Sequence, residues 1–401
     1  MLRTCGSNGN FFEKITRAIN QVPFDVKTIQ LALDQAKDGD IIAVTPGEYV
    51  ESVVVRSDVT IRAEIPSFHP PGASREVRIV ASGEGSTIRV SASERKEGDR
   101  ARTRITPRVL IGDITLMCKS DVLSDHVLEV DGAYVHVESC SIVGGTHGIF
   151  ACNHGEVKMS LSEVSGASRA GISCFSGARV HVQDSRILNN GENGVAVCGW
   201  SIDKNHFGSR VVVETSKIYN NKMFGVMAYG GGNVSLRGDD IMNNEKGGLF
   251  LMSEETVADV EYCRIKGNGC YGAIMHAEHR SIPKSLRVIK SDVRENEFGA
   301  WKIHPSLSKQ ADIYAASNRT SQDDDMDDED DDADIKGWLG AMGMQHLQEF
   351  FARVRISSLR EARALSIDDM KGMGIADEFA RRLILNRVTK TVTSRRAKEI
   401  A

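Results

Sequence analysis

Between residues 135 and 302, apolar and polar residues alternate in short segments, and the same segment recurs seven times. Each copy reads Val-x-Val-x-x-Ser-x-Ile, then a short polar turn, then Gly with an apolar residue; the third copy runs from Val180 to Gly194. Alternation with a period of two among β-branched residues predicts short strands with one buried face. The repeat glycines are Gly148, Gly171, Gly194, Gly225, Gly248, Gly272 and Gly299.

The spacing of the repeats selects the architecture. The glycines recur about every 23 to 31 residues, a period typical of one solenoid coil and too short for a pair of helices. Three strands with their turns use roughly 20 to 25 residues at a rise of about 3.3 Å per residue. Because equal positions of successive coils stack, each coil pairs its backbone with the next. The sequence therefore predicts a mainly β fold, a right-handed parallel β-helix over residues 28–317.

A column of asparagines fits this arrangement. Amide side chains stacked in the turns of a β-helix can hydrogen-bond to one another along its axis. Asparagine is also simply a good turn residue, so both interpretations predict a turn at this position. The column, three residues after each repeat isoleucine, consists of Asn190, Asn221, Asn244, Asn268 and Asn296.

Residues 28–37 have the spacing of an amphipathic helix, and short strand-like runs follow at 41–44 and 53–55. This segment is similar to the N-terminal part of pectin methylesterases and related right-handed β-helix proteins. The resemblance implies a helix that caps the open end of the solenoid, where the first coil would otherwise expose its core and an unpaired strand edge. Residues 1–27 are expected to form a separate N-terminal segment.

The pattern changes twice after residue 317. Residues 318–334 contain the acidic run 323–332, and a block of like charge repels itself, which predicts a disordered linker. Residues 335–392 change to a helical period and outline a small all-α bundle, and residues 393–401 form a basic tail.

The helical part resembles a sterile alpha motif (SAM) domain. The resemblance rests on Trp338, Leu339, Leu347, Phe350, Ile356, Leu359, the run 365–370, Gly374, Ile375 and a basic closing helix. Residues 376–379 depart from the family, which commonly has a Gly before its basic residues. Membership would imply association with itself or with other proteins, through an acidic mid-domain surface and the basic helix. These surfaces would contain Asp368 and Asp369, and Arg381, Arg382 and Arg387; an ordinary solvated charged surface is the alternative.

Composition narrows the functional classes. Lys and Arg number 50 against 55 Asp and Glu, with the acidic residues concentrated in one run, which argues against general nucleic-acid binding. No apolar run reaches the length that spans a membrane, and the N-terminus does not resemble a signal peptide. Eight cysteines in a chain this long do not form a disulfide scaffold. We therefore expect an intracellular, cytoplasmic or nuclear protein that is not secreted and binds neither membranes nor nucleic acid.

The candidates for catalysis are weak. Residues 47–51 and 183–184 resemble parts of pectin methylesterases, and 238–240 with 264–266 resemble polygalacturonases. The second carboxylate and the Gly-His-Gly of those families are missing, so a nucleophile would lack its acid/base partner. The repeat itself explains these matches, since Asp239 occupies the serine column. We predict that the chain is not an enzyme and holds no metal or cofactor; the alternative is a carbohydrate-active enzyme or carbohydrate-binding protein.

An apolar stripe follows the repeat glycines. If positions one and three after each Gly face the core, positions two and four face outward, and this sheet is apolar on both faces. A contiguous exposed apolar stripe usually marks an interface, unless another part of the chain covers it. The stripe consists of Phe150, Phe175, Met227, Tyr229, Phe250, Met252, Ile274 and Trp301. By contrast, the outward column beside the repeat serine is charged and is expected to be solvated.

Together these features predict a scaffold or adaptor with a rigid rod, an extended tether and a SAM-like association module. The expected partners are other proteins and a second copy of the chain. A cytoskeletal, axonemal (ciliary) or ubiquitin-ligase-type complex would suit such a rod by analogy of architecture.

Overall fold

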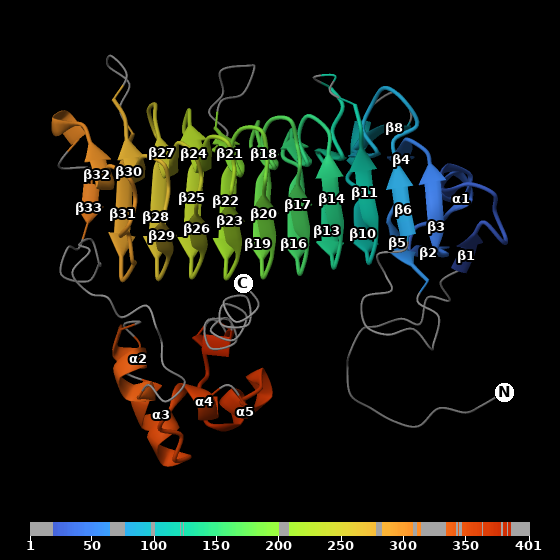
Figure 1. Cartoon of the computed structure of the whole chain (residues 1–401). Coiled ribbons are helices and arrows are strands. Elements are labelled where there is room, and N and C mark those ends of the chain that lie inside the picture. Colours follow the sequence, from blue (N-terminus) through green and yellow to red (C-terminus); the bar gives the residue numbers. More distant parts are fainter. Residues whose placement is uncertain are drawn as a thin grey trace, which may run out of the picture.

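A computed structural model describes most of the chain, coil after coil along one axis (Figure 1). The described residues are 19–64, 77–97, 101–120, 122, 124–199, 208–277, 283–307, 311–313, 334–341, 344, 347–362, 364–377, 380–382 and 384–385. Within them, almost every strand pairs in parallel with the equivalent strand of the next coil, which gives three long sheets. The prediction of a mainly β solenoid of parallel strands is confirmed.

Sheet A starts each coil. Its strands are β1 (Ile19–Val22), β2 (Asp40–Val44), β5 (Val59–Ala63), β10 (Arg108–Gly112), β13 (Tyr134–Glu138), β16 (Glu156–Ser160), β19 (Arg179–Gln183), β22 (Arg210–Glu214), β25 (Asn233–Arg237), β28 (Val257–Glu261), β31 (Ser285–Ile289) and β33 (Ala311–Ile313). The short strands β8 (Ser93–Glu97) and β9 (Ala101–Ile105) form a separate antiparallel hairpin.

Sheets B and C complete each coil. Sheet B contains β3 (Gly47–Val50), β6 (Val77–Val80), β11 (Thr115–Cys118), β14 (Ser141–Gly144), β17 (Glu163–Ser165), β20 (Arg186–Leu188), β23 (Lys217–Tyr219), β26 (Asp240–Met242) and β29 (Arg264–Lys266). Sheet C contains β4 (Val53–Val55), β7 (Ile88–Ser91), β12 (Leu128–Asp131), β15 (Ile149–Cys152), β18 (Ile172–Cys174), β21 (Val195–Cys198), β24 (Phe224–Tyr229), β27 (Gly247–Leu251), β30 (Tyr271–Met275) and β32 (Gly299–Ile303).

The strand register aligns equivalent residues of successive coils in columns. In sheet A, Val157 pairs with Val135 on one side and Val180 on the other, and all three are buried. One continuous hydrophobic cluster runs through the coils from Val22 to Leu307. Alternation along each strand therefore places one set of side chains in this core and the other outside.

The asparagine column forms a buried hydrogen-bond ladder. The Nδ2 of each asparagine donates to the Oδ1 of the next, at 2.9, 2.9, 3.0 and 2.8 Å along the series. The same Oδ1 atoms also accept the backbone N–H of the preceding asparagine. Buried amide groups need hydrogen-bond partners, and the ladder supplies them to the side chains and to the backbone N–H groups of these turns. It also holds successive coils in register.

The N-terminal end of the solenoid is covered by α1 (Ile29–Gln35) (Figure 1). Thr28 caps the helix, and the carboxylate of Glu51 accepts the backbone N–H groups of Ile29 and Gln30 at 3.0 and 3.1 Å. Strand β1 pairs with β2 and so extends the solenoid into residues 19–22, before the predicted boundary at residue 28.

The C-terminal part is helical, with α2 (Ile335–Ala341), α3 (Gln348–Arg353), α4 (Leu359–Ala362) and α5 (Ile367–Gly372). These helices enclose a second apolar cluster that includes Trp338, Leu339, Phe351 and Met370. The residues that suggested a helical bundle from sequence thus form its core. The predicted acidic linker, apart from Asp334, and the basic tail lie outside the described residues.

Candidate functional site

The outer face of sheet C carries most of the predicted apolar stripe. The register aligns Phe150, Ser173, Ala196, Met227, Phe250 and Ile274 in one outward column. Phe175, Tyr229 and Met252 follow in a second column, each two positions further along the chain. Phe150, Phe175, Met227, Tyr229, Phe250 and Met252 are half-buried, whereas Ile274 is buried.

Trp301 does not belong to this stripe. Gly299, the seventh repeat glycine in the sequence pattern, pairs with Tyr271, one position before Gly272. The register therefore shifts by one residue, and Trp301 pairs with Ala273 and packs against the core. Because strand side chains alternate, a shift of one residue reverses the face of the sheet. Lys302 takes the outward position instead.

A third outward column, one residue before each repeat glycine, was missed in the sequence pattern. It adds His147, Phe224 and Tyr271, and reading this position in each repeat would have found them. Phe224 stacks on Phe250 with ring centroids 4.6 Å apart, and Phe150 stacks on Phe175 at 5.7 Å. In these two pairs the rings stack from one coil to the next, so their faces are used on one another.

Two histidines close the aromatic row at its N-terminal end. His126 stacks on Phe150 at 4.4 Å, and His147 Nδ1 lies 2.9 Å from the hydroxyl of Ser173. Burial lowers the pKa of each imidazole to about 4, with a further contribution from nearby positive charge. Both rings are therefore neutral at physiological pH, and Ser173 is fully buried. This end of the row adds aromatic surface without adding charge.

A polar cavity lies at the corner between sheets A and B. Its volume is 280 Å³, and it is lined by Asp113, Ile114, Thr115, Ser139, Cys140, Ser141, Leu161, Ser162, Glu163, Asp184 and Arg186. Glu163 and Arg186 form an ion pair of 2.8 Å across neighbouring coils. Burial, helped by the charge of Glu138, raises the pKa of Asp113 despite nearby Arg62.

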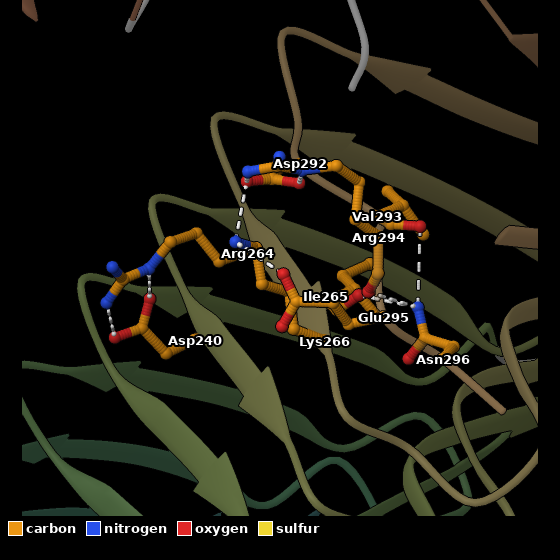
Figure 2. A network of polar contacts seen from close by, with 9 residues as sticks. All are labelled: Asp240, Arg264, Ile265, Lys266, Asp292, Val293, Arg294, Glu295 and Asn296. Carbon is orange, nitrogen blue, oxygen red and sulfur yellow. Dashed lines mark hydrogen bonds and ion pairs between the residues drawn. The ribbon is translucent and has the colours of Figure 1, made fainter. Parts of the chain in front are cut away.

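A network of charged side chains occupies the last coils of sheet B (Figure 2). Arg264 donates two hydrogen bonds to the carboxylate of Asp240, at 2.9 and 2.8 Å. Lys266 and Arg294 both bind the carboxylate of Asp292, at 3.0 and 2.9 Å. Burial alone would raise the pKa of Asp292, but the hydrogen bonds from Arg294 and Lys266 bring it below its usual value.

The expectation of a solvated column beside the repeat serine is wrong at Asp240 and Asp292, whose side chains are 0% and 16% exposed, whereas Arg186 in the same column is exposed. The Asp240 side chain is fully buried and that of Arg294 is 3% exposed. Asp240 is bound by Arg264, and Asp292 by both Lys266 and Arg294, so these carboxylates are compensated within a structural network.

The enzyme-like motifs also have structural roles. Asp239 accepts hydrogen bonds from the backbone N–H groups of Ser216 and Arg237, both at 2.8 Å. Ser185 likewise accepts from the backbone N–H of the preceding coil, at Ser162, and its hydroxyl donates to the carbonyl oxygen of Gln183. Within 47–51, Glu51 caps α1. Within the described residues, no group of three or more His, Cys, Asp and Glu side chains is arranged to hold a metal ion.

The predicted association residues of the helical part have different environments. Asp368 is exposed, whereas Asp369 accepts hydrogen bonds from the backbone N–H and hydroxyl of Ser366 and so caps α5. These bonds lower the pKa of Asp369. Arg387 lies outside the described residues.

Arg381 is not a surface residue, contrary to the prediction. It is 7% exposed, and its guanidinium donates to the carbonyl oxygens of Ile375 and Ala376. Its neighbour Arg382 points to the solenoid, where Nη1 lies 2.9 Å from Asp184 Oδ2. A helical period places successive residues on different faces, which explains why one arginine is internal and the other is not.

The chain matches two protein-family models. The right-handed β-helix region matches residues 202–318, and the sterile alpha motif (SAM) domain matches residues 330–390. The chain is therefore a right-handed parallel β-helix with a C-terminal SAM domain, as predicted from sequence. A SAM domain indicates protein–protein interaction and self-association in general terms. Among the described helices, none combines the length and the hydrophobicity needed to cross a bilayer.

Several solved structures are similar to the solenoid of this chain. A double mutant of the periplasmic alginate epimerase AlgG is 13% identical, with 71% of this chain and 76% of that one covered and a TM-score of 0.47. Pectate lyase Pel9A is 12% identical, with 78% of each chain covered and a TM-score of 0.42. The catalytic domain of a GH87 alpha-1,3-glucanase is 13% identical, with 79% and 71% covered and a TM-score of 0.38.

These similarities correct one prediction. The prediction that the chain is not an enzyme is wrong. The structures to which the chain is similar include an epimerase, a lyase and a glucanase. At such low identity they show the fold alone, and their substrates are not transferred to this chain.

Proposed function

We propose that this protein works by associating with other protein chains, through its SAM domain and through the aromatic outer face of sheet C. The observation that carries the proposal is the row of stacked rings and aliphatic side chains along that face, which includes Phe150, Phe175, Met227 and Phe250. Apolar and aromatic residues of this kind are enriched in the centres of protein interfaces.

The geometry favours a protein over a sugar on this face. Sugar rings stack on the faces of aromatic side chains, and here the faces of Phe224 and Phe250 are used on each other. Beyond Ser173, the outward column continues through Ala196, Met227, Phe250 and Ile274 with hydrocarbon and sulfur side chains, which lack the hydrogen-bonding groups that fix a sugar hydroxyl. Aromatic and aliphatic groups instead suit the close packing of another apolar surface.

Replacing Met227 and Phe250 together by Ser tests this function. We expect the dissociation constant of the chain's self-association to rise at least about tenfold, because buried aromatic anchors carry a large share of interface energy. Light scattering over a concentration series measures the mass. Phe24→Ser is the control, since Phe24 is 77% exposed and lies between β1 and α1 at the N-terminal end of the solenoid. An unchanged association curve, with both variants folded by circular dichroism, would argue against this surface.

A second candidate function is polysaccharide processing in the corner cavity. The observation that favours it is the set of carboxyl groups there, Asp113, Glu163 and Asp184, of which Asp113 has a pKa raised by burial. Enzymes that cleave glycosidic bonds use one carboxyl group with a raised pKa as acid and a second one as base or nucleophile. Ser and Thr hydroxyls and Arg186 provide further polar groups in the same cavity.

Activity assays on alginate, pectate and alpha-1,3-glucan test the second candidate. If it is correct, the protein turns over one of them, and Asp113→Asn lowers the rate by about 100-fold through loss of the general acid. Glu156→Gln is the control, because Glu156 is exposed on sheet A. No turnover of any of the three polysaccharides by the unmodified chain would count against this candidate.

A further inference from the structure

From β10 onward, each described turn from sheet A to sheet B contains one residue with a left-handed backbone. Asp184, Thr215 and Tyr262 occupy this position in three of the coils, with φ of 48°, 51° and 55°. Their side chains line up along one corner of the solenoid. The SAM domain contacts this corner at two separate points.

The first contact is an ion pair between residues far apart in the sequence. Arg382, in the helical segment 380–382, places Nη1 2.9 Å from Asp184 Oδ2. The other carboxylate oxygen of Asp184 accepts the hydroxyl of Thr215 at 2.6 Å, which fixes its orientation. Both charged side chains are about 30% exposed or less, so the pair is less screened than one on an open surface.

A second carboxylate lies nearby. Glu214 accepts from His181 Nε2 at 3.1 Å, and this bond, with the positive charge of Arg382 among the other contributions, lowers the pKa of Glu214. The corner thus offers two carboxylates to one guanidinium.

The second contact is apolar. Tyr262 is partly buried against the hydrophobic cluster of the SAM domain, whose members include Phe351 and Ile384. Lys290 Nζ donates to the Tyr262 hydroxyl at 3.1 Å. An apolar contact beside a charge pair is the composition of a small specific interface. Asp184 also lines the corner cavity, so the docked SAM domain sits at the rim of that cavity.

We propose that this corner of the solenoid is a docking surface for the chain's own SAM domain, and that docking withholds Arg382 from other SAM domains. The idea rests on the proposed function, in which the SAM domain associates with other chains. Because the two partners belong to one chain, docking is an intramolecular event, for which effective concentrations are on the order of millimolar. Association between chains at micromolar concentration then requires release of the corner contact.

Asp184→Arg in the full chain tests the proposal. Like charges would then face each other, and we expect the radius of gyration from small-angle X-ray scattering of dilute protein to rise. We also expect self-association, measured by light scattering, to begin at about tenfold lower concentration. Asp184→Asn is the milder variant, because asparagine tolerates the left-handed backbone at this position. The exchanged pair Asp184→Arg with Arg382→Asp should restore both quantities, and Glu156→Arg on exposed sheet A is the control.

The two readouts separate the two ideas. An unchanged radius of gyration in both Asp184 variants would overturn the docking surface, whatever the association does. A larger radius of gyration without any change in mass would leave the docking contact standing. It would overturn the idea that docking regulates association, and it would count against self-association through the SAM domain.

Discussion

Gly225→Ala is expected to destabilise the solenoid by about 3 kcal/mol, near the upper end of what overpacking costs in a closed core. A Cβ atom at Gly225 would lie 2.4 Å from Cγ2 of Ile241 and 2.8 Å from the carbonyl oxygen of Gly248 in the next coil. Ile241 is fully buried, and the carbonyl belongs to a paired strand, so neither can move away without separating the coils.

Urea unfolding followed by circular dichroism measures this loss. Gly83→Ala is the matched control, because a Cβ there would meet nothing within 4 Å and its φ lies outside the left-handed region. At such a position alanine should be neutral or slightly stabilising. Unfolding of the Gly225 and Gly83 variants at the same urea concentration would contradict the prediction. It would mean that neighbouring coils can move apart at the repeat glycine to make room for a Cβ atom.

The same close approach explains why the repeat was readable in the sequence. A position where only Gly fits, a buried isoleucine and a laddered asparagine recur together in the coils from Gly171 to Gly248, because the next coil imposes the same contacts on each. Gly248 repeats the pattern, with Ile265 and the Gly272 carbonyl too close for a Cβ atom. Because coils stack along one axis and contact only their neighbours, the same contacts recur once per coil, and the sequence repeats with the length of a coil.

The register of the last coil could not be predicted in this way. Gly299 looks like the seventh repeat glycine, but its backbone has φ of 112° and it lies opposite Tyr271. A turn that is one residue longer or shorter moves Trp301 to the other face of the sheet. The alternation of residues within the strand does not specify the length of the turn before it.

The environments of the charged residues were also hidden from the sequence. Asp240 and Arg264 stand in a column that looks solvated, and only the stacking of coils shows that they form a pair with a buried carboxylate. Arg381 and Arg382 are adjacent and identical in type, yet one is bound inside the SAM domain and the other reaches Asp184, 198 residues away. Burial and long-range pairing of this kind depend on tertiary structure.

Asn244→Ala is the second large effect, with an expected loss of about 2 to 3 kcal/mol in the free energy of unfolding, since buried donors would lose their partner. The Oδ1 atom of Asn244 accepts both the backbone N–H and the side-chain amide of Asn221, at 3.1 and 2.9 Å. Its own amide donates to Asn268 and to the carbonyl of Ile218, at 3.0 and 3.2 Å. Asn243→Gly is the control, because Asn243 is exposed and its left-handed φ suits glycine.

Asn244→Asp separates hydrogen bonding from side-chain volume in the same experiment. An ionised carboxylate would keep the acceptor for Asn221 but would face two other oxygen acceptors, those of Asn268 and Ile218. Burial and these contacts favour the protonated acid, so the folded-state pKa of the new carboxyl lies above its unfolded value. The loss of stability relative to the unmodified chain should therefore be largest at neutral pH and should shrink as the pH falls through the folded-state pKa. A loss that does not change with pH would mean that water reaches the ladder and solvates the charge.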